Sequence, residues 1–109
     1  MSYRSNRPKG GGKAMGGAMV VGIAWYKREE YDTLRRLFTD GDSLPDTYDK
    51  WLEKVGVVLK ELRREGRVSR KVYIDPVAFP AWCASKGFQV NGSARAQFSA
   101  EAVRLGKAG

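Results

Sequence analysis

The segment with the clearest potential for chemistry is residues 60–73, where cations gather beside an aromatic side chain. Residues 60–71 hold six lysines and arginines against two glutamates, a formal charge of +4. Cations that follow phosphates, next to a ring that stacks on a base, are typical of surfaces that bind nucleic acid. The candidate nucleic-acid-binding residues are Arg63, Arg64, Arg67, Arg70, Lys71 and Tyr73. The alternative is the solvated side of an edge strand, where lysine discourages aggregation.

A second group of cations lies in residues 1–18, which hold four lysines and arginines, no acid and five of the chain's 13 glycines. Basic residues outnumber acidic ones by 20 to 12 in the whole chain, and these two segments account for the entire excess. Such patches attract polyanions because binding releases counterions. The charge therefore favours weak, electrostatic binding to DNA or RNA, with a purely solubilising role as the alternative.

The residue types argue against catalysis. The chain has no histidine, which removes the commonest general base and the commonest metal ligand. Its one cysteine, Cys83, lies in an apolar segment and is expected to be a buried structural thiol. The spacing of Asp32, Asp49 and Asp75 does not favour converging carboxylates. A Ser–Lys pair stays open on composition alone, but we expect a protein without enzymatic activity.

Two stretches resemble known motifs but fail on their details. Gly10-Gly11-Gly12-Lys13 suggests a phosphate-binding loop, yet Arg7 stands where that loop needs its first glycine and Ala14 where it needs serine or threonine. Asp40-Gly41-Asp42 alternates two carboxylates, yet Trp51 stands where a calcium loop has its last glutamate. We therefore expect no metal and no cofactor, and a helix-to-helix turn at residues 40–42.

Two strands and four helices must position these residues. A continuous apolar run predicts a strand over 19–26 that is covered on both faces, and alternation predicts a second strand over 68–74. On the second strand, odd-numbered residues from 69 to 73 share one face, and even-numbered residues, Arg70 among them, share the other. Helical spacing of apolar residues predicts helices over about 29–39, from 43 to 66, from 75 to 87 and from 93 to 106.

Capping residues set the expected helix boundaries. Ser43 and Ser93 are expected to cap the second and fourth helices, and Asp75 the third. The last three helices are each expected to end at a glycine, at positions 66, 87 and 106. Trp51 and Trp82 lie in the apolar stripes of their helices, which predicts core positions for both.

The element order β-α-α-β-α-α favours the α/β class, with α+β as the alternative. It describes a helix-rich domain with a small two-stranded sheet that dimerisation could complete. We expect residues 1–18 to form a disordered, basic, glycine-rich tail and residues 19–109 a single compact domain. No apolar run approaches the ~20 residues that span a bilayer, so no membrane association is expected. A single cysteine allows no intrachain disulfide, and we expect a cytoplasmic protein.

Three stretches also resemble a group of small uncharacterised bacterial proteins. These are Gly22-Ile23-Ala24-Trp25-Tyr26, Leu44-Pro45-Asp46-Thr47-Tyr48 with Trp51, and Ile74-Asp75-Pro76 with Phe79, Trp82 and Cys83. The resemblance runs from Val20 to about Leu105 and leaves out the tail. It implies a bacterial cytoplasmic domain, and since no activity is established for the group, it assigns no site residues.

Together these patterns predict a small, non-catalytic binding module that associates with nucleic acid through its basic segment. The alternative is a protein-interaction module, either a homodimer or an accessory subunit, without a nucleic-acid role. In that alternative the strand over 19–26 is the expected interaction surface, because two strands alone form a marginal sheet.

Overall fold

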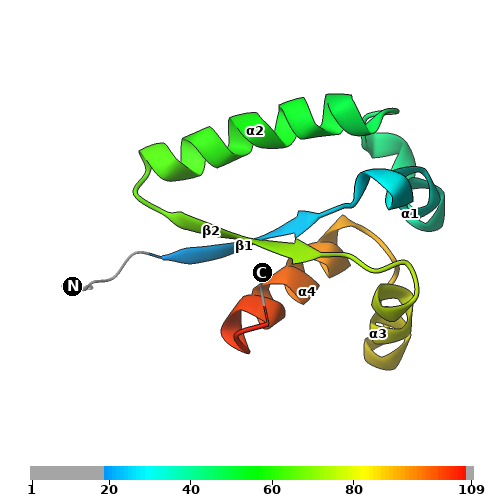
Figure 1. The fold of residues 1–109 in the computed structure, drawn as a ribbon. Helices are drawn as coiled ribbons and strands as arrows, with labels where there is room; N and C mark the ends of the chain where they lie inside the picture. Colours follow the sequence, from blue (N-terminus) through cyan, green and yellow to red (C-terminus); the bar gives the residue numbers. More distant parts are fainter. Residues whose placement is uncertain (1–18, 108–109) are drawn as a thin grey trace.

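A computed structural model describes residues 19–107 of the chain, and the expected tail over 1–18 lies outside the described residues. Within the described part, the predicted β-α-α-β-α-α order and the small, helix-rich α/β fold are confirmed (Figure 1). The elements are β1 (Val20–Trp25), a 3-10 turn (Arg28–Glu30), α1 (Tyr31–Leu37), a second 3-10 turn (Gly41–Ser43), α2 (Tyr48–Arg64), β2 (Val68–Tyr73), α3 (Ala78–Lys86) and α4 (Gly92–Arg104).

The sheet consists of β1 and β2, which pair in parallel from Val20 opposite Val68 to Trp25 opposite Tyr73. A parallel pair needs a long crossover, and α1 and α2 supply it. Both α2 and α4 run antiparallel to the strands, so the C-terminal ends of these helices lie at the end of the sheet where the strands begin (Figure 1). Because β2 directly follows α2, the predicted basic segment runs from the end of α2 into the sheet.

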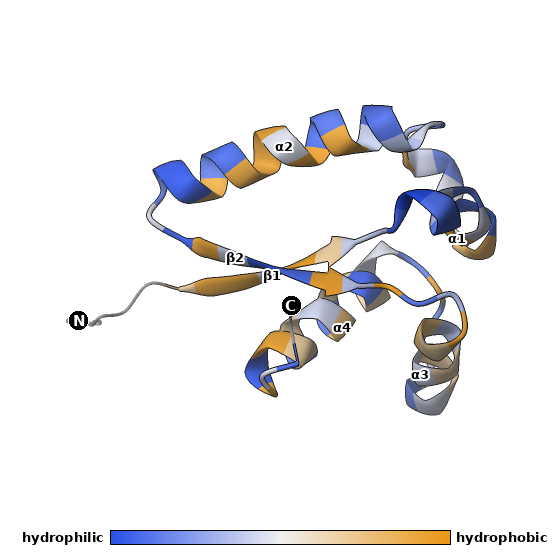
Figure 2. Cartoon of the chain, in the orientation of Figure 1, coloured by the Kyte–Doolittle hydropathy of each residue, from blue (hydrophilic) through white to orange (hydrophobic). Residues whose placement is uncertain are grey.

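Helices pack against both faces of β1, as expected from its apolar run. On one face the Trp25 ring packs edge-on against Trp51 of α2, with ring centroids 5.0 Å apart. On the other face Gly22 lies against the backbone of Ser99 in α4, so close that a Cβ at position 22 would overlap the Ser99 carbonyl oxygen. The hydrophobic residues of α2 follow the side that faces the sheet, and its hydrophilic residues face away (Figure 2). A glycine in β1 is thus what lets α4 dock.

The core is largely aromatic and gathers near the ends of the strands. Tyr26 packs against Tyr31, Phe38 and Trp51, at ring separations of 5.9, 5.9 and 4.8 Å. Phe79 extends this cluster toward α4 and is fully buried. These side chains join the crossover helices to α3 and α4, so both halves of the chain share one hydrophobic core.

Several predicted helix ends are confirmed. Gly66 and Gly87 have φ values of 76° and 74°, a left-handed conformation that glycine adopts without strain. The Asp75 carboxylate accepts hydrogen bonds from the backbone N–H groups of Val77 and Ala78, at 2.9 and 2.7 Å, at the start of α3. These bonds also hold the pKa of the Asp75 carboxyl below its usual range.

Two predicted N-caps are wrong. α2 begins at Tyr48, and Thr47, not Ser43, accepts from the backbone N–H of Lys50 at 3.2 Å. α4 begins one residue before Ser93, because Asn91 accepts from the Ala94 N–H at 3.1 Å. In both cases a second capping side chain stands within four residues of the one expected, and local preference alone does not separate them.

Candidate nucleic-acid interface

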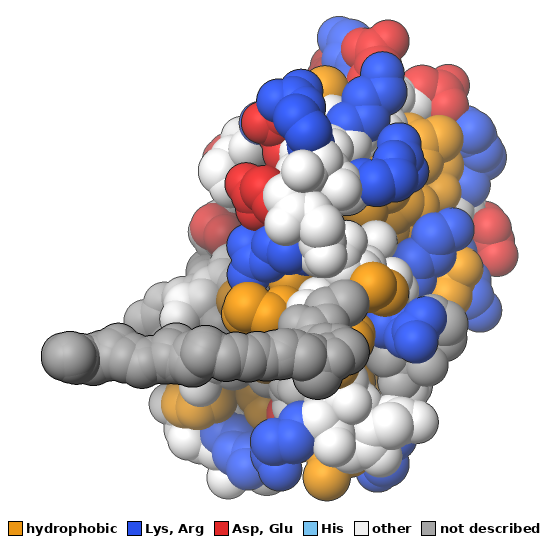
Figure 3. Space-filling view, turned by 90° about the vertical axis from the view of Figure 1, so that its left-hand side faces the viewer, with side chains coloured by type: hydrophobic (Ala, Val, Ile, Leu, Met, Phe, Trp, Pro, Cys, Tyr) orange, Lys and Arg blue, Asp and Glu red, His pale blue; other side chains and the backbone are white. Residues whose placement is uncertain are grey.

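The predicted cations lie at the C-terminal end of α2 and along β2. Arg63 and Arg64 form the last turn of α2, Gly66 reverses the chain, and Arg67 leads into β2. Figure 3 views the molecule from this end and shows Lys and Arg side chains with hydrophobic side chains exposed among them. We call Arg63, Arg64, Arg67, Arg70, Lys71 and Tyr73 the basic surface.

Ion pairs divide these cations into two groups. Arg64 contacts Glu61 at 2.7 Å, and Arg67 contacts Glu65 at 3.3 Å. Among residues 19–107, no carboxylate lies within 4.0 Å of Arg63, Arg70 or Lys71. Arg63, Arg70 and Lys71 are therefore the cations that are most available to bind an external anion.

The backbone of β2 decides where these side chains point. The Val68 N–H donates to Met19 and the Ile74 N–H to Trp25, so even-numbered residues of β2 bond to β1. By alternation, the backbone groups of Ser69, Lys71 and Tyr73 face the outer edge of the sheet. Five of the six β2 residues are exposed, all except Val72. Arg70 and Lys71 flank this edge from opposite faces, as the alternation predicts.

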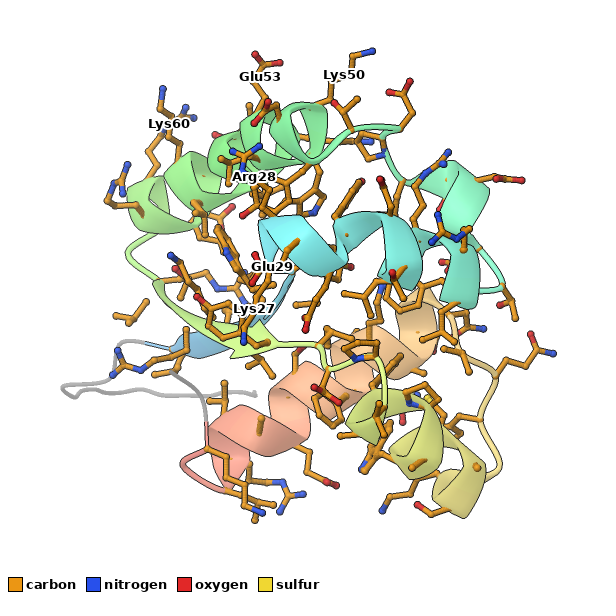
Figure 4. The ribbon with its side chains drawn as sticks, turned by 45° about the vertical axis from the view of Figure 1, so that its right-hand side comes forward. Lys27, Arg28, Glu29, Lys50, Glu53 and Lys60 are labelled. Atoms are coloured by element: carbon orange, nitrogen blue, oxygen red, sulfur yellow. The ribbon has the colours of Figure 1, made fainter. Side chains whose placement is uncertain are left out.

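Two lysine side chains lie close to aromatic rings at the end of the sheet where β2 ends. The Tyr73 side chain is 48% exposed, and the Lys27 ammonium lies 6.0 Å from the centre of its ring. The Lys71 ammonium lies 4.4 Å from the centre of the Trp25 ring. Lys27 follows β1 and stands beside the end of β2 (Figure 4). It was not among the predicted site residues, because only the parallel pairing of the strands brings it there.

Other charged groups near α2 are already engaged or point elsewhere. Arg28 contacts Asp49 at 2.9 Å and lies 4.6 Å from the centre of the Tyr48 ring. Lys50 and Glu53 project from the side of α2 that faces away from the sheet (Figure 4). The outer side of α2 therefore alternates charges of both signs and forms no basic track.

A cavity of about 420 Å³ opens between β2, α3 and α4, and we call it the β2–α4 cavity. Its walls include Tyr73, Trp82 and Phe98, and Lys107 lies at its margin. Trp82 is only half-buried and also borders a second cavity of about 370 Å³ between α3 and α4. The core position predicted for Trp51 is confirmed, whereas Trp82 lies partly at the surface.

A buried polar network near the ends of the strands has no counterpart in the sequence-based expectations. The Arg95 guanidinium donates to both oxygens of Asp40, at 2.9 and 3.2 Å, and stacks 4.3 Å from the centre of the Phe38 ring. The Gly92 N–H donates to the same carboxylate at 2.9 Å. Arg95 holds the pKa of the Asp40 carboxyl below its usual range, and burial raises the pKa of Tyr26 to about 12. This network ties the turn after α1 to the start of α4.

The candidate reactive groups of the sequence can be placed in the described residues. Over residues 19–107, no three His, Cys, Asp or Glu side chains gather as a metal site. Asp40, half of the Asp-Gly-Asp stretch, is committed to Arg95. Cys83 is 1% exposed and burial raises the pKa of its thiol, which keeps it protonated and unreactive. In the part that the structure describes, no helix is both long and apolar enough to cross a membrane.

No protein-family model matches this chain, and neither the curated proteins nor the solved structures include a significant match to it. The resemblance to small bacterial proteins stays a prediction. The functional argument therefore rests on the geometry of the basic surface and of the cavity beside it.

Proposed function

We propose that this protein is a non-catalytic module that binds nucleic acid through the basic surface. One observation carries the proposal. Arg63 at the end of α2, and Arg70 and Lys71 on β2, have no acidic partner within residues 19–107. The exposed edge of β2 that carries Arg70 and Lys71 ends at a half-exposed tyrosine ring. Cations that follow a backbone and a ring that accepts a base are the two components of single-strand binding.

The distribution of charge supports phosphate as the target. Outside residues 1–18 and 60–71, basic and acidic residues are equal in number, so the excess of the described part lies in this one segment. Each phosphate that a cation neutralises releases counterions, and this gives affinity without sequence preference. We therefore expect weak binding that falls steeply as salt is added.

The test is the salt dependence of binding for the full chain and one variant. Fluorescence anisotropy with short labelled single strands of DNA and RNA gives the dissociation constant over a range of salt concentrations. Arg63→Ala, Arg70→Ala and Lys71→Ala, combined, should lower the slope of log affinity against log salt by about 0.7–0.9 units for each phosphate that is no longer neutralised. No binding of either strand at low salt and micromolar protein would overturn the proposal.

A matched control removes three exposed cations elsewhere. Arg36, Lys50 and Lys54 lie on α1 and the N-terminal half of α2, distant in sequence from the basic surface. Their combined change to alanine lowers the net charge by the same amount. It should leave the salt slope nearly unchanged. Equal reductions in both triple variants would mean that only total charge matters and that no defined surface exists.

A second copy of the chain is the other candidate partner, and one observation favours it. β1 carries no charged residue, and the backbone groups of Val20, Gly22 and Ala24 face away from β2. An uncharged edge lacks the usual protection against pairing, whereas Arg70 and Lys71 protect the edge of β2. Mass measured by light scattering during size-exclusion chromatography separates monomer from dimer, and Ala24→Lys should abolish a dimer that pairs through β1.

A further inference from the structure

We propose that the β2–α4 cavity receives a base of a single-stranded nucleic acid whose phosphates lie on the basic surface. This inference rests on the proposed function and adds a specific pocket to it. The two sites are continuous, because Tyr73 belongs to the basic surface and also lines the cavity.

The size of the cavity suits a small planar ligand. Its volume of about 420 Å³ lies within the range of about 300–1,000 Å³ typical of small-molecule pockets. Its aromatic walls already pack edge to face, since the rings of Trp82 and Phe98 are 5.2 Å apart at an angle of 77°. Val72 and Leu105 complete the apolar lining. A base is a flat ring that such walls contact on both sides without needing a particular sequence.

One carboxylate gives the cavity a polar side. Glu101 accepts from the Trp82 indole N–H at 3.2 Å, and its other oxygen lies 3.9 Å from Lys86 and 3.6 Å from Arg104. These contacts fix the indole and balance the charge of Glu101. A carboxylate oxygen accepts hydrogen bonds from the N–H groups of a base, whereas it repels the carboxylate of a fatty acid.

Cations lie near the margin of the cavity, where they can bind the phosphates next to a bound base. Gly106, with φ 73°, reverses the chain after α4, and the Lys107 N–H then donates to the Ala102 carbonyl at 2.7 Å. This turn brings Lys107 to the cavity. On β2, Arg70 stands two residues before Val72 and shares the face of the strand on which Val72 lines the cavity. An apolar pocket with cations at its margin fits a nucleotide better than an uncharged peptide.

The decisive comparison is between a single-stranded oligonucleotide and an abasic strand with the same number of phosphates. Both engage the basic surface, but only the first offers a base to the cavity. The full chain should bind the oligonucleotide about 5- to 150-fold more tightly, the factor that corresponds to one stacked base. Binding should also quench tryptophan fluorescence, because Trp82 borders the cavity.

Two Ala→Leu variants of α4 test whether the base binds in the β2–α4 cavity. Ala102 lines the β2–α4 cavity, whereas Ala100, two residues away, lines only the other cavity. Ala102→Leu should fill the space and reduce the preference for the oligonucleotide over the abasic strand to about one. Ala100→Leu should keep the preference. If Ala102→Leu does not fold, as judged by circular dichroism, Ala102→Met takes its place, because the flexible methionine side chain fills the same space with less strain.

The outcomes separate the two proposals. Equal affinity for the two strands would overturn base binding, both in the cavity and on the Tyr73 ring, and would leave only phosphate binding by the cations. A preference that survives Ala102→Leu, or Ala102→Met where that variant is used, would place the base elsewhere and overturn the assignment of the cavity. Binding of neither strand at low salt would overturn the proposed function, and base binding with it.

Discussion

The ion pair between Asp40 and Arg95 is the feature whose removal should change stability most clearly. Arg95 is 7% exposed and its guanidinium is held by both oxygens of Asp40, 55 residues away in sequence. Asp40→Asn keeps the shape of the side chain and removes its charge, which leaves a buried cation without a counter-charge. Loss of one partner of a buried pair costs about 3–5 kcal/mol.

The expected loss for Asp40→Asn is smaller than that range, because the Asp40 side chain is 34% exposed. Water screens part of the attraction, and the asparagine oxygen still accepts one hydrogen bond. We expect the free energy of unfolding to fall by about 2–3 kcal/mol. Urea denaturation followed by tryptophan fluorescence measures it, and Asp42→Asn, in an exposed position two residues away, is the control and should have little effect.

The pH dependence of the stability difference tests whether the loss in Asp40→Asn is electrostatic. The folded-state pKa of Asp40 is lowered, so the ion pair contributes fully above the unfolded-state pKa of about 3.9. The contribution is lost as pH falls below that value and through the folded-state pKa. The difference in stability between the wild-type chain and Asp40→Asn should therefore shrink between pH 6 and pH 3. A difference that stays constant over that interval, or a loss at pH 7 below about 0.5 kcal/mol, would refute an electrostatic origin.

Three further experiments test the packing at Gly22, the cap of α4 and the burial of Cys83. Gly22→Ala should lower the free energy of unfolding by about 1–3 kcal/mol in urea denaturation, because the new methyl group meets the Ser99 backbone. Asn91→Ala should cost about 1 kcal/mol and Ser93→Ala much less, because only the first side chain caps α4; thermal unfolding measures the order of the two. Cys83 should react with a thiol reagent only at the rate of unfolding, and fast labelling of the native protein would show that its helix opens locally.

Much of the fold could be predicted from sequence because local patterns determine it. The apolar run of β1, the alternation of β2 and the stripe of α2 each leave one physical solution, and glycine at 66 and 87 marks a helix end without a competitor. The starts of α2 and α4 were misplaced because two capping side chains compete within a few residues. The parallel pairing of the strands and the close approach of α4 at Gly22 both need three-dimensional information.

The same distinction applies to the candidate site, where some features follow from local sequence patterns and others only from the tertiary fold. The cations of β2 and the exposure of Tyr73 follow from strand alternation, which the sequence displays. The position of Lys27 beside Tyr73 depends on strand pairing, and the position of Lys107 at the cavity depends on the turn after α4. No local sequence pattern predicts either. The pairing of Asp40 with Arg95 is equally invisible, because a lone acid and a lone arginine 55 residues apart have no spacing rule. Contacts made by the tertiary fold are thus what sequence reasoning missed.

A cation on an exposed strand edge has two physical roles, protection against edge-to-edge pairing and attraction of phosphate, and they respond differently to the sign of the charge. Protection needs charge of either sign, because like charges on two edges repel. Phosphate binding needs positive charge. Arg70→Glu with Lys71→Glu should therefore keep the protein free of aggregates in light scattering and abolish binding to single strands. Arg70→Ser with Lys71→Ser is the neutral comparison and should also lose affinity. If the serine variant aggregates while both the wild-type and the glutamate variant stay dispersed, and none of the three binds a single strand at low salt, then these cations serve only to protect the edge.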